Sequence, residues 1–492
     1  MKILLVYPEY PKTYWSFSYA LKFVSKKASF PPLGLLTVAA VLPGPWKKRL
    51  VDLSVGPLKD QDLLWADYVF ISAMVIQKES TRKVIDRCKA LQVKTVAGGP
   101  LFTCGSDEWG DIDHLILGEG ELTLPAFLSD LEAGNPKPVY TSEGWANLET
   151  TPIPLWDLID SRKYAQLNIQ YSRGCPFNCE FCNITSLYGH TPRTKGAAQL
   201  LRELDAIYET GWRGGVFFVD DNFIGNKKKL KEEVLPLLIE WMTARNHPFY
   251  FQTEASINLA DDEELMGLMT KASFNSVFIG IETPNEESLL ECNKLQNKNR
   301  DLITCVKKIQ QFGLQVQGGF ILGFDNDNAT IFNKLVNFIQ ESGIATAMVG
   351  LLNAPRGTKL HQRLVSEGRL LNDISGDNTD LTMNFIPKMD RETLTKGYQQ
   401  TINAIYAPKN YYQRVRTFLK EYRPKKPGGS HLQFNEVMAF FKSVVRLGII
   451  GRERFYYWKL VFWSLFRCPR QFPMAITLSI FGFHFRKIFE NY

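Results

Sequence analysis

Residues 173–183 read Arg-Gly-Cys-Pro-Phe-Asn-Cys-Glu-Phe-Cys-Asn, and the fold can be worked out from this stretch. Its cysteines, Cys175, Cys179 and Cys182, are separated by three and then two residues, which places three thiolates within reach of one metal centre. An iron–sulfur cluster is normally held by four thiolates. The nearest other cysteines, Cys104 and Cys292, are far along the chain. The spacing therefore predicts a cluster with one iron left open to bind another group.

Two other interpretations of these thiols remain open. His190 lies eight residues beyond Cys182 and could complete a four-ligand zinc site. The three cysteines could also be unrelated buried thiols, because cysteine is among the residue types most often found in protein cores. The chain has only 8 cysteines in 492 residues, so this spacing rarely arises by chance, which favours the cluster.

The composition is that of a large globular chain with about two to four domains. Hydrophobic residues make up 45% and aromatic residues 13%, enough for extensive cores. The scattered remaining cysteines do not suggest a disulfide framework, so we expect a reducing, cytoplasmic compartment. The apolar run at the N-terminus is too short for a signal peptide, and no run of 18 apolar residues predicts a membrane-spanning helix.

Residues 1–150 are predicted to form a Rossmann-like α/β domain. Short apolar strands alternate with helices, a pattern typical of a parallel sheet covered on both faces. Ligands of such folds bind beyond the carboxyl ends of the strands. Small or polar residues stand at those ends: Tyr7-Pro8, Ser72-Ala73, Gly98-Gly99-Pro100 and Gly118-Glu119-Gly120. They predict a site for a bulky ligand, and the lack of Gly-x-Gly-x-x-Gly after the first strand argues against an ordinary dinucleotide.

A linker at 151–166 precedes a second α/β series at 167–375. We predict its six strands at about 167–172, 215–219, 249–254, 276–281, 316–322 and 346–352. Six strand–helix units predict a partial (βα)6 TIM-like barrel, with the cysteine loop after its first strand, at the end where active sites form. Polar residues follow the later strands: Asp220-Asp221-Asn222, Thr253-Glu254, Glu282-Thr283, Asp325 and Asn353. Some of these carboxylates are expected to cap helices, and their shared rim predicts that others bind a ligand.

Cys-x-x-x-Cys-x-x-Cys after the first strand of such a barrel resembles the signature of the radical S-adenosylmethionine (SAM) superfamily. The resemblance implies a [4Fe–4S] cluster on the three cysteines, whose open iron binds SAM. It also implies SAM contacts from an aromatic residue of the motif and from the later strands, here Phe181, Asp220, Asp221, Glu282, Gly319, Ile321 and Gly323. Asp220-Asp221-Asn222 departs from the glycine-rich segment that many members carry, which leaves the contact to the methionine amine open.

The first domain resembles the cobalamin-binding domain of the B12-dependent class within that superfamily. The stretches that carry this resemblance are Phe30-Pro31-Pro32-Leu33-Gly34, Gly98-Gly99-Pro100 and Gly118-Glu119-Gly120-Glu121. The resemblance implies that cobalamin lies against Tyr7, Pro8, Ser72, Ala73, Gly98, Gly99, Gly118, Glu119 and Gly120.

The histidines bear on how cobalt is held. The chain has six, none lies in residues 1–113, and the Asp-x-His-x-x-Gly cobalt-ligand motif is absent. His114 directly precedes an apolar stretch and is expected to be structural. The sequence therefore predicts cobalamin bound without a histidine ligand from the protein.

By resemblance, the chemistry is reductive cleavage of SAM to a 5′-deoxyadenosyl radical, followed by C-methylation of an unactivated carbon. Hopanoid and bacteriochlorophyll methylases are similar family members, which implies a hydrophobic substrate, lipid-like or tetrapyrrole-like. The alternatives are a non-methylating B12 radical SAM enzyme that forms rings or oxidises, and a non-catalytic cobalamin and iron–sulfur sensor. A methylthiotransferase is disfavoured because no second cysteine cluster is present. The sequence identifies no catalytic side chain.

Residues 376–492 are predicted to be a mostly helical extension, with a charged linker at Lys420–Pro427. From residue 409 onward the chain has 16 Lys and Arg against 4 Asp and Glu, a net charge of +12, whereas the remainder carries −5. Basic and aromatic residues on short helices suit peripheral contact with the inner face of an anionic membrane. A helical cap on the barrel is an equal alternative, and nucleic acid is disfavoured because no RNA-binding module is recognisable. The other expected partners are a small-molecule substrate and an electron donor such as flavodoxin or ferredoxin.

Overall fold

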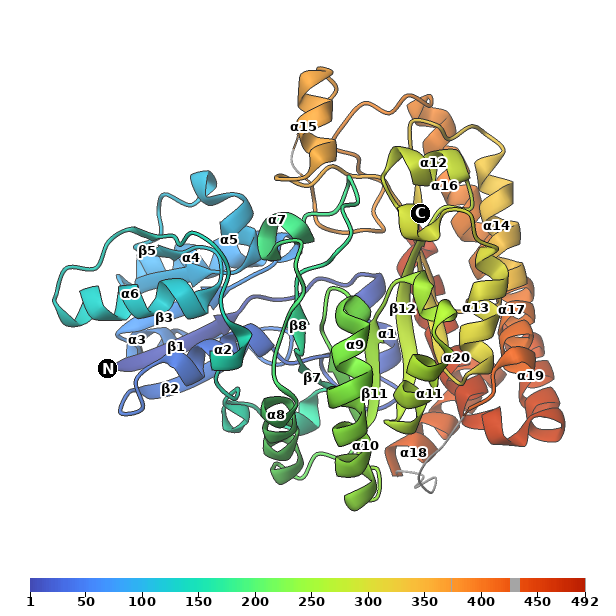
Figure 1. Cartoon of the computed structure of the whole chain (residues 1–492), viewed down its shortest axis with the longest axis horizontal. Helices are drawn as coiled ribbons and strands as arrows, with labels where there is room; N and C mark the ends of the chain where they lie inside the picture. Colours follow the sequence, from blue (N-terminus) through green and yellow to red (C-terminus); the bar gives the residue numbers. More distant parts are fainter. Residues whose placement is uncertain (373, 425–433, 492) are drawn as a thin grey trace.

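The computed structural model describes residues 1–372, 374–424 and 434–491, and it contains two parallel six-stranded sheets followed by a helical region (Figure 1). The first sheet consists, in spatial order, of β2 (Lys47–Asp52), β1 (Lys2–Tyr7), β3 (Tyr68–Ser72), β4 (Lys94–Gly98), β5 (His114–Ile116) and β6 (Val139–Tyr140). All its neighbouring strands run parallel, as the alternation of apolar strands and helices predicts.

Helices cover both faces of this first sheet. One face packs against α2 (Leu33–Val41) and α6 (Gly120–Glu132), and the other against α3 (Asp60–Trp65), α4 (Lys78–Ala90) and α5 (Pro100–Cys104). Alternate residues of β1 divide between the two cores: Leu4 belongs to the core of α3, α4 and α5, and Leu5 to that of α2 and α6. The Rossmann-like prediction is confirmed for this region.

The second sheet is the predicted partial barrel. In spatial order its strands are β7 (Leu167–Ile169), β10 (Gly215–Phe218), β11 (Tyr250–Glu254), β12 (Phe274–Glu282), β13 (Gln315–Leu322) and β14 (Ala347–Leu351). The helices between these strands are α8 (Ala197–Glu209), α10 (Leu235–Ala244), α11 (Glu263–Lys271), α13 (Leu302–Gln311) and α14 (Ile331–Ser342). The first strand is shorter than the predicted 167–172, because residues 172–173 leave the sheet as β8 (Ser172–Arg173) and pair with β9 (Arg193–Thr194).

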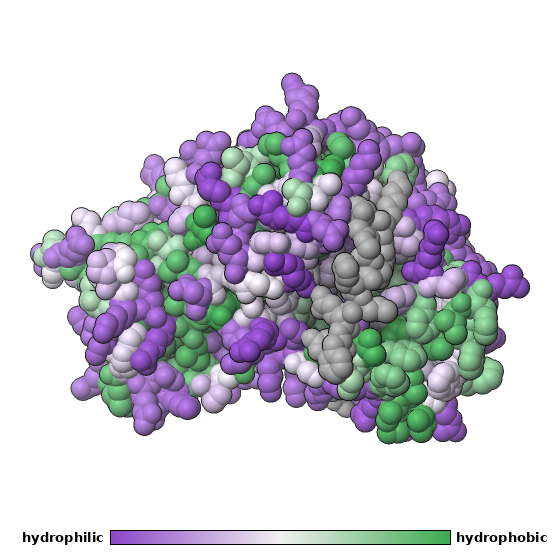
Figure 2. All heavy atoms as spheres, turned by 90° about the horizontal axis from the view of Figure 1, so that it is seen from below, coloured by the Kyte–Doolittle hydropathy of each residue, from purple (hydrophilic) through white to green (hydrophobic). Residues whose placement is uncertain are grey.

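The extension is helical, as predicted. α15 (Lys359–Ser366) follows β14 before the predicted start of the extension at residue 376. The helices of the extension are α16 (Arg391–Tyr406), α17 (Pro408–Glu421), α18 (Phe434–Ser443), α19 (Arg454–Arg467) and α20 (Phe472–Ile488). The predicted linker begins inside α17, and its part from residue 425 lies outside the described residues. Seen from below, apolar side chains gather over the part of the molecule that these last helices form (Figure 2).

The segment between β1 and α2 closes the open side of the partial barrel, which the sequence did not reveal. Trp15 donates its indole N–H to Met348 Sδ on β14 at 3.1 Å and packs edge-on against Phe278 of β12. Further along the segment, the Pro31 carbonyl accepts a hydrogen bond from Asn168 on β7 at 3.2 Å. The segment thus reaches both edge strands of the open sheet, and it forms part of the barrel wall.

Tyr406 ties this segment to the C-terminal helices. Its hydroxyl donates to the Ala347 carbonyl at 2.6 Å and lies 3.0 Å from the Tyr14 hydroxyl, while the Tyr14 ring stacks on Phe485 with ring centres 4.2 Å apart. Tyr14 and Tyr406 are both buried. These contacts join β14, the N-terminal segment and α20 at one point.

We expect Tyr406→Phe to lower the apparent melting temperature by about 2–4 °C. The substitution leaves the buried Ala347 carbonyl without its donor, a loss of about 1 kcal/mol or more, and this is the shift that such a loss causes in a domain of ordinary size. Differential scanning fluorimetry measures it. Tyr19→Phe is the control, because the Tyr19 hydroxyl makes no hydrogen bond within the described residues. Equal melting temperatures for both variants would show that the Tyr406 hydrogen bond does not stabilise the fold.

Candidate functional site

The cysteine loop is an excursion between β8 and β9 at the mouth of the barrel. Gly174 opens it at φ +93°, and a Cβ there would lie 3.0 Å from the carbonyl oxygens of Tyr188, Gly189 and Thr191. Only glycine fits such a site, because an L side chain would be both strained and crowded. The outgoing and returning limbs of the loop are therefore held tightly together at its base.

The three cysteines of the loop are free and partly buried. The Cys182 N–H donates to the Cys179 carbonyl at 3.2 Å, a turn that keeps the two residues adjacent. Burial raises the pKa of Cys182 to about 12, so a thiolate there needs a cation beside it. Lys294 supplies one charge, and it interacts with both Cys179 and Cys182. This donor set fits an iron–sulfur cluster.

Among the described residues no three His, Cys, Asp or Glu side chains converge closely enough to hold a single metal ion. A zinc ion would require ligand atoms at about 2.0–2.3 Å from the metal. These ligand atoms would lie much closer to one another than the thiolates around a four-iron cluster do. His190, the fourth ligand in the zinc interpretation, is exposed. The arrangement of the thiols therefore gives the zinc alternative no support.

A cavity of about 2450 Å³ runs between the two sheets and into the barrel. Typical small-molecule sites occupy about 300–1,000 Å³, so this cavity has room for more than one ligand. Its walls come from the carboxyl ends of the first sheet, the cysteine loop, the barrel interior and helices α18 and α20. Four of the residues predicted to bind SAM line it: Phe181, Glu282, Gly319 and Ile321.

Asp220, Asp221 and Gly323, also predicted to bind SAM, lie outside the cavity lining. Asp220 is buried, and its carboxylate accepts hydrogen bonds from the backbone N–H groups of Tyr171 and Ser172 and from the Ser172 hydroxyl. The Asp221 carboxylate accepts the Gly174 N–H at 2.9 Å. The two carboxylates thus hold in place the chain that leads into the cysteine loop. Their contact with SAM stays a prediction, because neither side chain lines the cavity.

Gly323 and Glu282 are also held by the protein. Gly323 has φ +104°, donates its N–H to Asp327 at 3.0 Å and faces Leu394 of α16. Glu282 sits at a register shift in β12 with φ +65°, and its carboxylate pairs with Lys294 at 2.7 Å. Through this pair the end of β12 holds Lys294 beside the cysteine loop, and Glu282 itself lines the cavity.

Glu254 is a site residue whose importance the sequence only hinted at. It ends β11 and lines the cavity, and its side chain makes no hydrogen bond or ion pair with another described residue. Burial raises its pKa to about 8, and the nearby charges of Asp221 and Asp220 add to the effect. At neutral pH this side chain is therefore mostly a protonated carboxylic acid that offers a hydrogen-bond donor to the cavity.

The carboxyl ends of the first sheet border the same cavity. Of the residues predicted to bind cobalamin, those that line it are Tyr7, Ser72, Ala73, Gly98, Gly99, Gly118, Glu119 and Gly120. Pro8 does not line the cavity, and its carbonyl accepts a hydrogen bond from Gln77 at 2.6 Å. A Cβ on Gly98 would lie 2.8 Å from the Ile116 carbonyl oxygen, so glycine there also serves the packing of β4 beside β5.

Glu119 and Glu121 connect this rim to the cysteine loop through two arginines. Arg173 donates to Glu119 at 2.8 Å and to Glu121 at 2.7 Å, and Arg193 donates to Glu119 at 3.0 Å. The Glu119 and Glu121 side chains are only 2% and 11% exposed. Burial opposes ionisation of Glu121, but Arg173 outweighs it and holds the pKa of Glu121 below its usual range. We call these four residues the interdomain ion cluster.

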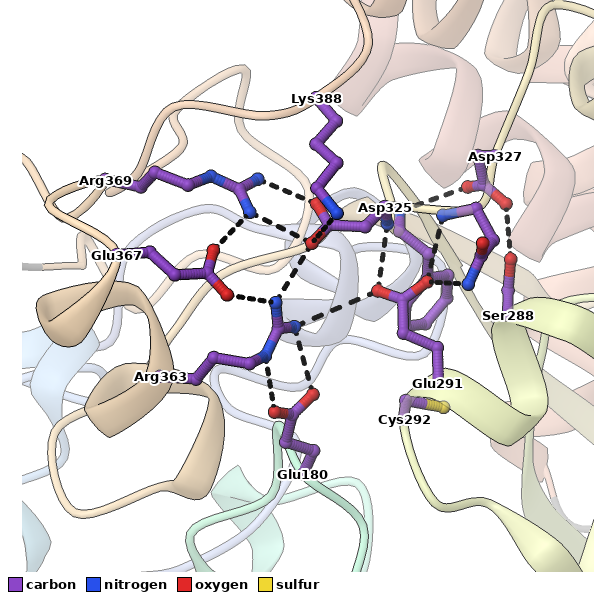
Figure 3. Close-up of polar contacts among 12 residues, drawn as sticks. Glu180, Ser288, Glu291, Cys292, Asp325, Asp327, Arg363, Glu367, Arg369 and Lys388 are labelled. Carbon is purple, nitrogen blue, oxygen red and sulfur yellow. Dashed lines mark hydrogen bonds and ion pairs between the residues drawn. The ribbon is translucent and has the colours of Figure 1, made fainter.

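A second ion cluster fastens the outer side of the loop (Figure 3). Glu180, inside the cysteine motif, accepts two hydrogen bonds from Arg363 of α15, at 2.7 and 3.1 Å. Arg363 and Arg369 both donate to Asp325, which follows β13. Burial opposes ionisation of Asp325, but Arg369, Arg363 and Lys388 prevail and hold its pKa at about 2. The sequence placed Asp325 at the rim but gave no sign of its partners.

Comparison with known proteins agrees with this geometry. Residues 24–128 match the B12 binding domain, residues 169–339 match the Radical SAM superfamily, and residues 358–492 match a domain of unknown function. The chain is 41% identical over 490 residues to an uncharacterized methyltransferase of Synechocystis, covering 99% of this chain and 91% of that one. It is 34% identical over 478 residues to the hopanoid C-2 methylase of Rhodopseudomonas palustris, covering 95% and 90%.

Among solved structures, the fold resembles the radical S-adenosylmethionine methyltransferase TsrM from Kitasatospora setae, determined with cobalamin and a [4Fe–4S] cluster bound. The TM-score is 0.65 at 15% identity, and 98% of each chain is covered. At this identity the likeness concerns the fold. It extends over both sheets and the helical region.

We expect Arg173→Met to lower iron content by at least half and the melting temperature by roughly 10 °C. The change leaves Glu121 buried without its partner, and breaking a buried pair costs about 3–5 kcal/mol. Iron and sulfide analysis of anaerobically purified protein measures the first effect and calorimetry the second. Arg162→Met is the control, because Arg162 is 88% exposed and, among the described residues, pairs only with neighbouring Asp160. Wild-type iron content in Arg173→Met would refute the role of the interdomain ion cluster.

Stability below neutral pH should depend on Asp325. Its pKa is lower in the folded protein than in the unfolded chain, where it is about 3.9, so its stabilising effect is present above about pH 4 and lost as the pH falls towards 2. Arg363→Met removes one partner, raises the pKa of Asp325 and moves this loss to higher pH. Melting temperatures of the cluster-free protein between pH 7 and 3 test this.

The matched control for Arg363→Met is Arg391→Met. Arg391 is exposed at the start of α16 and forms no ion pair within the described residues. Superimposable pH profiles for the two variants would show that the Asp325 pair does not stabilise the fold.

Proposed function

We propose that this chain, which belongs to the radical SAM superfamily and to its B12-binding branch, methylates a carbon of a polycyclic lipid. It is a cobalamin-dependent radical SAM methylase that acts on a hydrophobic substrate. The narrower substrate class rests on the similarity to the hopanoid C-2 methylase, which extends through the C-terminal helices. The lining of the barrel interior is the observation that supports a polycyclic lipid as the substrate.

The lining of the barrel combines polar residues, among them Gln252, Gln315 and Gln317, with aromatic side chains and a methionine. The aromatic and methionine side chains that reach the cavity include Trp15, Phe217, Phe278 and Met348. Trp15 and Phe278 meet edge to face, with ring centres 5.4 Å apart. Flat, rigid hydrocarbon rings bury well against such a surface, because dispersion and the hydrophobic effect scale with contact area. The lumen therefore suits a fused-ring lipid.

Three cofactors fit the residues around the cavity. Cys175, Cys179 and Cys182 would hold a [4Fe–4S] cluster, and Phe181, Glu282, Gly319 and Ile321 would border SAM. The glycines and small residues at the ends of β3, β4 and β5 would lie against cobalamin. When bound, these groups supply an electron for SAM cleavage and a methyl group for transfer, chemistry that protein side chains cannot perform.

We propose that cobalamin is bound without a histidine ligand. His114 lies at the start of β5, away from the carboxyl ends of the strands, and its ring Nδ1 is 2.7 Å from the Lys137 carbonyl. Tyr7 and Tyr10 line the cavity beside the end of β1 instead. Burial raises the pKa of Tyr10 above its usual value, so the phenol stays protonated at neutral pH and is a poor cobalt ligand.

The chain itself positions reactants and excludes water. The interdomain ion cluster fixes the rim of the first sheet against the cysteine loop. The apolar lumen keeps solvent away from a reactive carbon. Glu254 offers a neutral hydrogen-bond donor, because its pKa of about 8 leaves it protonated at neutral pH. The finer sites predicted for SAM and cobalamin are part of this proposal.

Two further parts of the proposal concern partners. An electron donor such as flavodoxin or ferredoxin would reduce the cluster. The basic, apolar C-terminal helices would touch a membrane surface from the cytoplasmic side. No helix in the described ranges is long and apolar enough to cross a bilayer.

The test uses anaerobic, reconstituted protein with SAM, a strong reductant, hydroxocobalamin and a bacterial lipid extract. Wild-type protein should yield 5′-deoxyadenosine, S-adenosylhomocysteine and a lipid heavier by one methylene. Cys179→Ala should reduce 5′-deoxyadenosine at least a hundredfold, because the loop then offers only two thiolates. Cys88→Ala is the control, since Cys88 is buried in the core of the first domain away from the loop. A parallel reaction offers a tetrapyrrole in place of the extract, and methylation of the tetrapyrrole but of no lipid would overturn the substrate class.

A further inference from the structure

The cavity has two chemically different ends. One end reaches Cys182 and the glycine-rich rim of the first sheet, where the cofactors would lie. The other reaches the residues at which the barrel strands begin, among them Gly215, Tyr250 and Gln315, and the helices α18 and α20. The lumen therefore extends along the whole length of the barrel strands.

The far end is walled by apolar side chains of the C-terminal helices. α18 contributes Val437, Ala439 and Phe440, and α20 contributes Ile476 and Ile480. No residue of the proposed cofactor sites lies at this end. These helix side chains suit a hydrocarbon better than SAM, which carries charged amine, carboxylate and sulfonium groups. Polar residues, among them Gln315, line the strand side of the same end.

The cavity meets the surface beside α18. Tyr250, at the start of β11, and Val437 both line the cavity and are each 39% exposed. Glu436, also on α18, lines the same cavity. We call this opening, bordered by Tyr250, Val437 and Ala439, the lower portal.

The outside of α18, of residues 444–450 and of α19 carries an apolar patch, seen as the green area in Figure 2. Phe441 is 57% exposed, Ile450 63% and Phe466 78%. Met438, Val445, Ile449, Phe455, Phe462 and Leu465 are also exposed. Large apolar patches on a protein surface mark interaction sites. We call these nine residues the C-terminal patch.

Basic side chains accompany the C-terminal patch. Arg452, Arg454, Lys459, Arg467 and Arg470 are exposed and form no ion pair within the described residues. A protein partner or a second copy could cover apolar side chains, but five unpaired cations around them are complementary to an anionic lipid surface. The positive charge therefore favours an anionic bilayer as the partner of the C-terminal patch.

We infer that the lipid substrate passes from an anionic bilayer through the lower portal into the barrel, at the end opposite the cysteine loop. The inference rests on the proposed function and adds the route by which the lipid substrate enters the barrel. α18 connects the two surfaces, because Ala439 and Phe440 face the cavity while Met438 and Phe441 face outward. Cofactors and substrate then enter by different ends and meet in the lumen.

The test offers the fluorescent sterol dehydroergosterol to the full-length protein from two sources. Vesicles of phosphatidylcholine and phosphatidylglycerol carry it in one arm, and methyl-β-cyclodextrin carries it in the other. Uptake is read as the dehydroergosterol fluorescence that stays with the protein after size exclusion separates it from the vesicles or the cyclodextrin. Vesicle binding is measured separately by co-sedimentation.

The double variant Phe441→Asp/Phe466→Asp should lower uptake from vesicles at least tenfold and leave uptake from cyclodextrin unchanged. Leu290→Asp, whose side chain is 54% exposed on α12 (Glu286–Glu291), should change neither. Ala439→Trp should lower uptake from both sources while vesicle binding persists, because it narrows the lower portal. Ala439→Leu should give a smaller effect, and this graded series guards against misfolding of the larger variant.

Four outcomes would overturn the inference. Bilayer docking would be refuted if the double variant took up sterol from vesicles as well as the wild type does. It would also be refuted if light scattering showed that the wild type is a dimer and the double variant a monomer, because the C-terminal patch would then bind a second copy of the chain. Unchanged uptake by Ala439→Trp would refute the lower portal. A wild-type protein that methylates lipid extract but takes up sterol from neither source also refutes the route, and the proposed function then stands. Uptake without methylation of any lipid refutes the proposed function alone.

Discussion

The interdomain ion cluster is the interaction on which the rest of the site depends. Two carboxylates from the rim of the first sheet and two guanidinium groups from the base of the cysteine loop are buried together. Burying such charges is costly unless each is paired, so the geometry tolerates little displacement. The position of one sheet relative to the other is thereby fixed at the point where the proposed cobalamin and cluster sites adjoin.

Much of this fold follows from the sequence, because its signals are local. The spacing of Cys175, Cys179 and Cys182, the apolar strands and the small residues at strand ends all lie within short windows. The partners of Glu119 could not be found in this way, since Arg173 and Arg193 are 54 and 74 residues away. Charge alone does not indicate which arginine reaches which carboxylate.

Carboxylates at strand ends show a second limit of sequence reasoning. Asp220 and Asp221 stand where a SAM contact is expected, yet their oxygens accept backbone N–H groups of the segment entering the cysteine loop. Glu254 stands at the next strand end, and its carboxyl faces the cavity without a partner among the described residues. All three look alike in the sequence. What distinguishes them is the path of the neighbouring chain, which only the three-dimensional arrangement gives.

The N-terminal segment that closes the barrel also constrains how the protein is made. Tyr14 stacks on Phe485, so the barrel wall joins residues from the two ends of the chain. During synthesis the first domain emerges early, but this contact can form only after α20 has left the ribosome. An excised barrel that begins near residue 150 would lack this wall and expose its apolar lumen. The two domains are thus separate in topology but form one unit in folding.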